Sequence, residues 1–241
     1  MTETRPIAVF RFSRTEGPGH FATFLDENRL AWTLVKLDEG DTVPASSEAF
    51  AGLGFMGGPM SANDELPWTQ PVLSLMRDAA RQRVPMIGHC LGGQLLSRAL
   101  GGHVSRSPVK EIGWVRVEVE PTPLAREWLG DGIEAFESFQ WHEDAFSLPP
   151  DSQRILAGRD CPNQAYVVGG LHLGMQCHVE MTAEMIDTWC RTGGDEIEES
   201  RSGSEAVQDA RTIRGLERKN LPNLTATAGR LYSRWIQGLR R

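Results

Sequence analysis

The chain has 241 residues, of which 40% are hydrophobic and 24% are charged, and its formal net charge is −7. This length accommodates one α/β domain with a sizeable core and an extension. The negative charge argues against nucleic acid as a partner, although the sequence becomes more basic after residue 211. No run approaches the roughly 18 apolar residues of a membrane span, and residues 1–6 do not resemble a signal peptide. We therefore expect a cytoplasmic protein with no membrane partner.

Apolar runs alternate with helical patterns over the first hundred residues. Strands are expected at residues 7–12, 34–37, 53–56 and 84–87. Between them, apolar residues at helical spacing predict helices that carry Phe21, Phe24 and Leu25, then Val72, Leu75, Met76 and Ala79. This alternation predicts a mostly parallel sheet with helices on both faces, and ligands at the carboxyl ends of its strands.

Residues 88–92 read Gly-His-Cys-Leu-Gly between the expected strand 84–87 and a helix over 94–100. A G-x-C-x-G pattern in this place is the cysteine form of a nucleophile elbow. Its glycines allow a sharp turn that exposes the central side chain at the strand edge. The partial positive charge of the helix start favours the thiolate, which is the nucleophilic form of cysteine. Cys90 is therefore a candidate nucleophile rather than a buried structural cysteine.

A base and a group that orients it are expected near residue 178. Residues 171–178 alternate as a strand does, and side chains two apart on a strand share a face. His178 and Glu180 can then point together toward Cys90 as a Cys-His-Glu triad. The N–H groups of Gly58, after strand 53–56, and of Leu91 would stabilise a developing oxyanion.

The sequence of the second half of the domain predicts further strands, and it predicts no metal site. Residues 114–119 alternate as a half-exposed antiparallel strand, and residues 155–157 and 166–168 extend the sheet. His172 and His178 lie too far apart along a strand to share a metal with Cys177. The four cysteines form no C-x-x-C pair and no disulfide framework, which suits a reducing compartment.

Three segments, at residues 57–59, 88–94 and 174–180, resemble the signature blocks of the class I glutamine amidotransferases in their order and spacing. The resemblance covers residues 1–190. It implies a three-layer α/β/α, flavodoxin-like fold and a fixed role for each site residue. Cys90 would be the nucleophile, His178 the general base and Glu180 its orienter, while Gly58 and Leu91 would form the oxyanion hole.

The resemblance also implies how substrate is held. Gln94 would contact the glutamine. Residues 140–144 are similar to the segment whose backbone receives its amino-acid end, which implicates Gln140, Trp141 and His142. Val179 stands where the family usually has proline, but an extended valine can adopt the same backbone geometry, so the triad is expected to survive.

The implied reaction releases ammonia from the side-chain amide of glutamine through a γ-glutamyl thioester on Cys90, without a cofactor. Residues 191–241 are too few for a synthetase, so an ammonia acceptor would lie on another chain. The alternative is a γ-glutamyl peptidase or hydrolase, which acts on other γ-glutamyl amides and needs no synthetase partner.

The sequence divides into a domain over 1–190 and a helical extension over 191–241. Residues 191–208 are acidic and nearly without apolar anchors, which predicts an exposed connection or a polar helix. Beyond them an amphipathic helix carries Leu224, Ala228, Leu231 and Trp235. Its apolar face either folds back on the domain or forms a homodimer contact or a docking surface for a partner.

Overall fold

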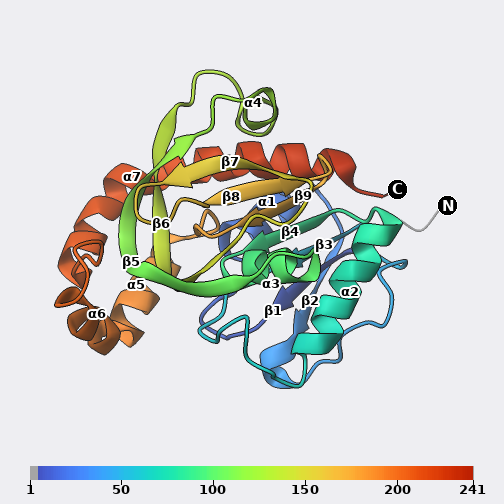
Figure 1. Cartoon of the computed structure of the whole chain (residues 1–241), viewed down its shortest axis with the longest axis horizontal. Helices are drawn as coiled ribbons and strands as arrows, with labels where there is room; N and C mark the ends of the chain where they lie inside the picture. The colour runs from blue at the N-terminus through green and yellow to red at the C-terminus, as the bar shows by residue number, and fades with distance from the viewer. Residues whose placement is uncertain (1–4, 241) are drawn as a thin grey trace.

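The computed structural model describes residues 5–240, which form one nine-stranded sheet in the order β2-β1-β3-β4-β9-β8-β7-β5-β6 (Figure 1). The first five strands in this order run parallel, and they are β2 (Trp32–Lys36), β1 (Ile7–Arg11), β3 (Gly52–Phe55), β4 (Met86–His89) and β9 (His172–Met175). The other strands are antiparallel, and they are β8 (Ala165–Val168), β7 (Ser152–Gly158), β5 (Val104–Val119) and β6 (Ala135–Phe146).

Helices cover both faces of the parallel half, which confirms the expected three-layer fold. The alternation in β1 shows the two faces, because Ile7 and Val9 enter one hydrophobic cluster while Ala8 and Phe10 enter the other. The first cluster is covered by α1 (Gly19–Glu27) and α7 (Ala210–Trp235), and the second by α2 (Thr69–Gln82) and α3 (Leu91–Ala99). The other α-helices of the described residues are α4 (Pro123–Leu129), α5 (Ala183–Thr192) and α6 (Gly194–Arg201).

One predicted strand ends earlier than its sequence pattern indicates. The run 171–178 was expected to stay extended through residue 178, but β9 ends at Met175. Beyond it the Gln176 N–H still pairs with the chain next to β8, donating to the Gln164 carbonyl over 2.8 Å. The His178 N–H then donates to the Phe139 carbonyl of β6, also over 2.8 Å. The residues after Met175 therefore cross toward β6, and the pairing of His178 with Glu180 does not come from one strand face.

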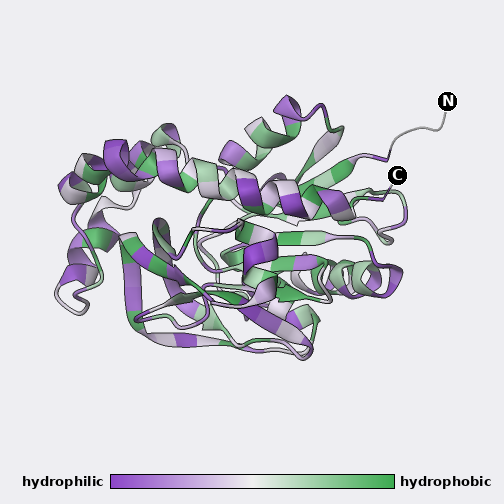
Figure 2. Cartoon of the chain, turned by 90° about the horizontal axis from the view of Figure 1, so that it is seen from above, coloured by the Kyte–Doolittle hydropathy of each residue, from purple (hydrophilic) through white to green (hydrophobic). Residues whose placement is uncertain are grey.

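The predicted amphipathic helix is α7, and it folds back on the domain. Leu224, Ala228, Leu231 and Trp235 are all buried in the cluster that also holds the β1 and α1 side chains. Figure 2 shows hydrophilic and hydrophobic residues interspersed along this helix, while the central strands are mostly hydrophobic. The polar segment before it contains α6, whose one buried residue is Ile197. Of the helices within residues 5–240, none combines the length and apolar character that a membrane crossing requires.

Replacing Trp235 with alanine should lower the free energy of unfolding by about 3–5 kcal/mol, because this fully buried indole packs edge-on against Phe21. Urea titration measures the change. Arg218→Ala on the same helix is the matched control, since Arg218 is exposed and should shift the midpoint little. Equal losses from the two variants would show that the apolar face of α7 does not anchor it.

Candidate active site

The strand-to-helix turn at Cys90 has the geometry of a nucleophile elbow. Cys90 has φ 47° and ψ −107°, an unfavourable backbone conformation for a residue with a Cβ. The neighbouring glycines are required by close backbone approach. A Cβ on Gly92 would overlap the Phe55 carbonyl, and one on Gly93 would overlap the Met175 carbonyl. The thiol is thus held at the carboxyl end of β4 and at the start of α3.

His178 and Glu180 form a tight buried pair beside this turn. The His178 Nδ1 lies 2.6 Å from the Glu180 Oε1, and both residues are almost fully buried. The Trp189 ring packs edge-on against the imidazole, with 4.9 Å between ring centres. Within residues 5–240 the opposite ring nitrogen of His178, Nε2, has no hydrogen-bond partner, so it remains available for proton transfer.

The electrostatics of the pair favour a charged imidazole. Burial opposes protonation of His178, but the negative charges of Glu180 and of a Cys90 thiolate outweigh it and raise the pKa of the imidazole well above its ordinary value. Burial likewise favours neutral Glu180, yet the positive charge of His178 keeps the pKa of this carboxyl below its usual range. The arrangement therefore places a charged imidazole, oriented by a carboxylate, beside Cys90.

Cys90 opens into a cavity of about 460 Å³ at the carboxyl ends of the parallel strands. Gly58 lines this cavity and lies next to Leu91, because a Cβ on Gly58 would approach the Leu91 side chain to 2.7 Å. The remaining wall comes from loops and helices of both halves of the fold, and includes Thr15, Glu16, Gln94, Lys110, Trp141, His142, Glu143, Asp144, Trp189 and Glu196.

Gln94 connects the nucleophile to strand β6. Its side-chain amide donates to the Asp144 carbonyl over 3.0 Å and to the Gln176 Oε1 over 3.2 Å. Gln176 in turn places its amide nitrogen 3.5 Å from the Cys90 sulfur. The sequence interpretation gave Gln176 no role, although it lies in the third signature block, two residues before His178.

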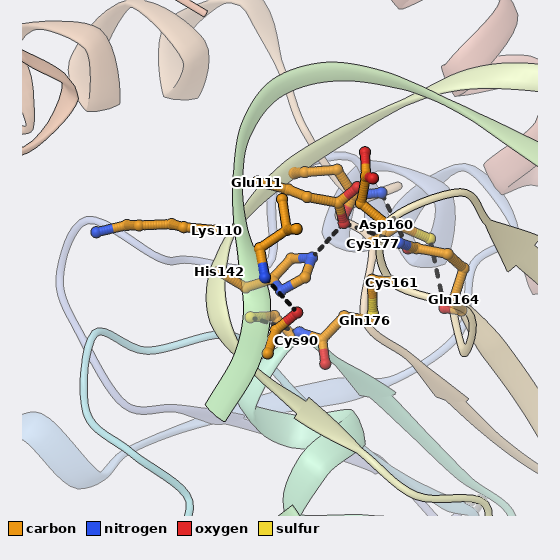
Figure 3. Close-up of polar contacts among 12 residues, drawn as sticks. Cys90, Lys110, Glu111, His142, Asp160, Cys161, Gln164, Gln176 and Cys177 are labelled. Carbon is orange, nitrogen blue, oxygen red and sulfur yellow. Dashed lines mark hydrogen bonds and ion pairs between the residues drawn. The ribbon is translucent and has the colours of Figure 1, made fainter. Parts of the chain in front are cut away.

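The segment 140–144 divides between the cavity and a buried polar network. Trp141 and His142 line the cavity, whereas Gln140 does not and instead donates to the Gln164 Oε1 over 2.9 Å. His142 pairs through Nε2 with the Glu111 carboxylate at 3.0 Å, and Gln164 donates to the same oxygen. In Figure 3 the Glu111 and His142 side chains point toward each other, while the adjacent Lys110 points away. This network supports the wall of the cavity from behind.

Glu111, His142 and Cys161 could together hold a metal ion, since each offers one ligand atom and these atoms lie within 4.8 Å of one another. No metal site was predicted from the sequence, and these three residues were not among the candidate ligands. The hydrogen bond between His142 and Glu111 already pairs two of the three ligand groups. Burial raises the pKa of the Cys161 thiol to about 12, which keeps it neutral in the absence of a cation.

Comparison with known proteins identifies the family of this chain. A sequence model of that family, described as glutamine amidotransferase class-I, matches residues 22–189. The chain belongs to the class I glutamine amidotransferase family. A crystal structure of a glutamine amidotransferase from Methylobacillus flagellatus superimposes with a TM-score of 0.96 at 45% sequence identity, covering 99% of this chain and 97% of that one.

Curated proteins similar to this chain have names that indicate different activities. The glutamine amidotransferase-like protein YfeJ of Salmonella typhimurium is 27% identical over 71% of this chain and 74% of its own length. A glutamine-hydrolysing GMP synthase component from Sulfurisphaera tokodaii is 33% identical over 53% of this chain and 65% of its own length. Gamma-glutamyl peptidase 2 of Arabidopsis thaliana is 25% identical, with 70% of each chain covered.

An electrophilic glutamine analogue should label Cys90 well ahead of the other three cysteines at neutral pH. Cys90 lines the cavity, whereas burial raises the pKa of Cys161 and of Cys177 to about 12 and also raises that of Cys190. Mass spectrometry of labelled peptides measures the order. Equal labelling of all four cysteines, or none at Cys90 in the folded protein, would contradict its assignment as the nucleophile.

Glu111→Ala should destabilise the protein by about 3–5 kcal/mol, because it leaves His142 Nε2 and the Gln164 amide without their shared acceptor in a buried site. Glu111→Gln keeps a side-chain oxygen there and should cost less. Thermal and urea denaturation of both variants measure the difference. A fully stable Glu111→Ala protein would show that the network does not support the cavity wall.

Proposed function

We propose that this chain hydrolyses γ-glutamyl amides, glutamine among them, through a Cys90–His178–Glu180 triad. The observation that carries the proposal is the buried 2.6 Å contact between His178 and Glu180 beside the strained turn at Cys90. A nucleophile, a base and an orienting carboxylate at one cavity are what acyl transfer through cysteine requires. Membership of the family supports the same reading.

In the first step the Cys90 thiolate attacks the γ-carbonyl carbon of the substrate. The carbonyl oxygen becomes an oxyanion, which the N–H groups of Gly58 and Leu91 stabilise, each by roughly 3 kcal/mol. His178 donates its proton to the departing nitrogen as the C–N bond breaks, so the amine leaves neutral. A γ-glutamyl thioester remains on Cys90.

In the second step water attacks this thioester. Neutral His178 removes a proton from the water, and the oxyanion forms again at the same donors. The C–S bond breaks, glutamate leaves, and the thiolate and imidazolium pair is restored. No cofactor enters either step. The buried Glu180 carboxylate holds the Nδ1 tautomer throughout and stabilises the imidazolium each time that it forms.

The γ-glutamyl end of the substrate is assigned to the side of the cavity built by Gln94 and residues 140–144. Gln94 donates both of its side-chain N–H groups, to the Asp144 carbonyl and to Gln176, so its Oε1 is held ready to accept from an N–H of the substrate. Trp141 and His142 contribute the wall of this side, and Gln140 supports it through the network behind. We assign the reaction to the cytoplasm, where reducing conditions leave the Cys90 thiol free.

Two forms of the reaction compete within this proposal. In the amidotransferase form, ammonia passes to a synthetase on another chain, as the name of the GMP synthase relative suggests. In the hydrolase form, the leaving amine is an organic group and no acceptor is needed, as the name of the γ-glutamyl peptidase relative suggests. The two forms differ in the leaving amine, so rates on different amides separate them.

Cys90→Ala and His178→Ala should each reduce kcat on glutamine by about 10³-fold or more, because each removes a group that forms or breaks bonds. Glu180→Gln keeps the shape of the side chain and should lose less. Steady-state release of glutamate measures all three variants, with circular dichroism as the control for folding. An unchanged kcat in Glu180→Gln beside an inactive His178→Ala would mean that another group orients the imidazole.

The substrate form is tested by kcat/KM on glutamine and on γ-glutamyl peptides. Rates on a peptide at least about 10²-fold above glutamine, roughly 2.7 kcal/mol of transition-state preference, would establish the hydrolase form. Weak glutamine hydrolysis that rises on addition of a synthetase partner would support the amidotransferase form. The purified chain should not consume ATP in either case, and ATP hydrolysis by it would contradict both.

A further inference from the structure

Four acidic side chains line the cavity, and three of them already have partners. Asp144 accepts a hydrogen bond from the Ser61 hydroxyl over 2.6 Å. Glu143 pairs with Arg106 at the rim. Glu196 pairs with the Lys110 ammonium at 2.6 Å and also accepts from the Trp141 indole over 3.0 Å.

Glu16 is the fourth acid, and among residues 5–240 its carboxylate forms no ion pair and accepts no hydrogen bond. The positive charge of His178 acts on it from nearby, but that charge is already paired with Glu180. Glu16 is half-buried in the cavity wall. A half-buried carboxylate without a partner carries an unfavourable desolvation cost, which a bound cation would offset. A bound cation can therefore offset a charge that His178, paired with Glu180, compensates only in part.

The loop that carries Glu16 is held in place by the active site itself. The Glu16 N–H closes a turn onto the Ser13 carbonyl over 3.1 Å, and the Trp189 indole donates to the Thr15 carbonyl over 2.7 Å. Trp189 is the ring that packs edge-on against His178. The carboxylate is thus preorganised relative to the imidazole, as a binding group should be.

Glu16 lies on the His178 side of the cavity. Both side chains lie against the same side of Gly57, because a Cβ built there would overlap the Glu16 Oε2 and lie 3.1 Å from the His178 Cε1. His178 must approach the departing nitrogen in order to protonate it, whereas the γ-glutamyl end is assigned to Gln94 and residues 140–144. The group that extends from the departing nitrogen therefore passes Glu16.

We propose that Glu16 is the recognition group of a leaving-amine subsite, which selects γ-glutamyl amides whose amine carries a second, positively charged nitrogen. This proposal rests on the proposed function. The substrate class is the mono-γ-glutamyl amides of aliphatic diamines. Water cleaves the amide bond through the Cys90 thioester, and the products are glutamate and the free diamine.

The acids around the subsite favour a cation over an anion. Glu16 and Glu196 lie near each other, and Lys110 is already paired with Glu196. A carboxylate on the leaving amine would meet these two acids, while the lysine of the same wall is already paired, and like charges in a cavity repel strongly. The same cavity should therefore disfavour γ-glutamyl derivatives of amino acids, which carry an anionic group.

Three length-matched amides test the charge preference. The γ-glutamyl amides of 1,4-diaminobutane, pentylamine and 4-aminobutyrate carry a cationic, neutral and anionic end, respectively. The wild-type kcat/KM should be roughly 10- to 100-fold higher for the cationic amide than for the neutral one, the range expected for one charge-assisted contact. The anionic amide should be the poorest of the three. Equal values for the cationic and neutral amides would overturn the proposal.

Glu16→Gln removes the charge while it keeps the shape, and it should lower kcat/KM on the cationic amide to the value that the same variant has on the neutral one. Glu16→Asp should keep part of the preference. Glu27→Gln, on the exposed surface of α1, is the control for a general change of charge and should leave all three rates unchanged. Equal losses on all three amides in Glu16→Gln would assign Glu16 to the chemistry and overturn its role in selection.

The pH dependence of the preference gives a second readout. Burial raises the pKa of Glu16 to about 7, with His178 opposing this shift and Glu180 and Glu196 adding to it. Glu16 therefore loses its charge as the pH falls through this value. The ratio of the cationic to the neutral rate should fall as the pH is lowered from about one unit above this pKa to about one unit below it in the wild type, and stay flat in Glu16→Gln. A flat ratio in both proteins would contradict the proposal.

Binding to the Cys90→Ala protein separates this proposal from the proposed function. Calorimetry should show tighter binding of the diamine amide than of the pentyl amide, and Glu16→Gln in the same background should remove the difference. Selective binding without hydrolysis by the wild type would overturn the function and retain the subsite. Hydrolysis by the wild type without selective binding would retain the proposed function and overturn the subsite.

Discussion

The active site depends on one backbone constraint, the unfavourable conformation of Cys90 between β4 and α3. Strand β4 lies between β3 and β9. The carbonyl at the end of β3 lies against Gly92, and the carbonyl at the end of β9 lies against Gly93. The central strands therefore supply the packing that stabilises the strained turn. The positions of the proposed oxyanion donors and of the proposed triad follow from this turn, because the segments that carry them leave the same edge of the sheet.

The antiparallel half of the sheet completes the site from the other side. The backbone bond from His178 to Phe139 attaches the triad to β6, and the bond from Gln94 to the Asp144 carbonyl attaches α3 to the same strand. Each half of the fold thus holds part of the cavity. A substitution in the network of Glu111 and Gln164 behind β6 can therefore shift the cavity wall, although these residues do not contact the reacting atoms.

The sequence was most informative where function requires a local pattern. The elbow could be predicted because the turn leaves no room for side chains at the glycines on both sides of Cys90. The parallel half of the sheet could be predicted because strands and helices alternate along the sequence. The pairing of His178 with Glu180 was predicted from a strand that in fact ends at Met175, so the expected contact exists by a different path. The buried position of Glu111 was not predicted. The pairing of β5 with β6 changes register between Arg106 and Glu111, and this change decides which side chains of β5 face inward. Such register changes leave little trace in a sequence.

The hydrogen bond between the His89 ring and the Tyr232 hydroxyl, over 3.1 Å, joins the residue before the nucleophile to α7. The ribosome makes α7 after every strand and helix of the central sheet. While the sheet is being synthesised, the face of β4 behind the elbow therefore has only part of its cover, from Phe21 of α1, and the nascent chain exposes apolar surface around Phe21 until α7 arrives. The support behind the thiol is thus completed late in folding, after the turn that carries the thiol has left the ribosome.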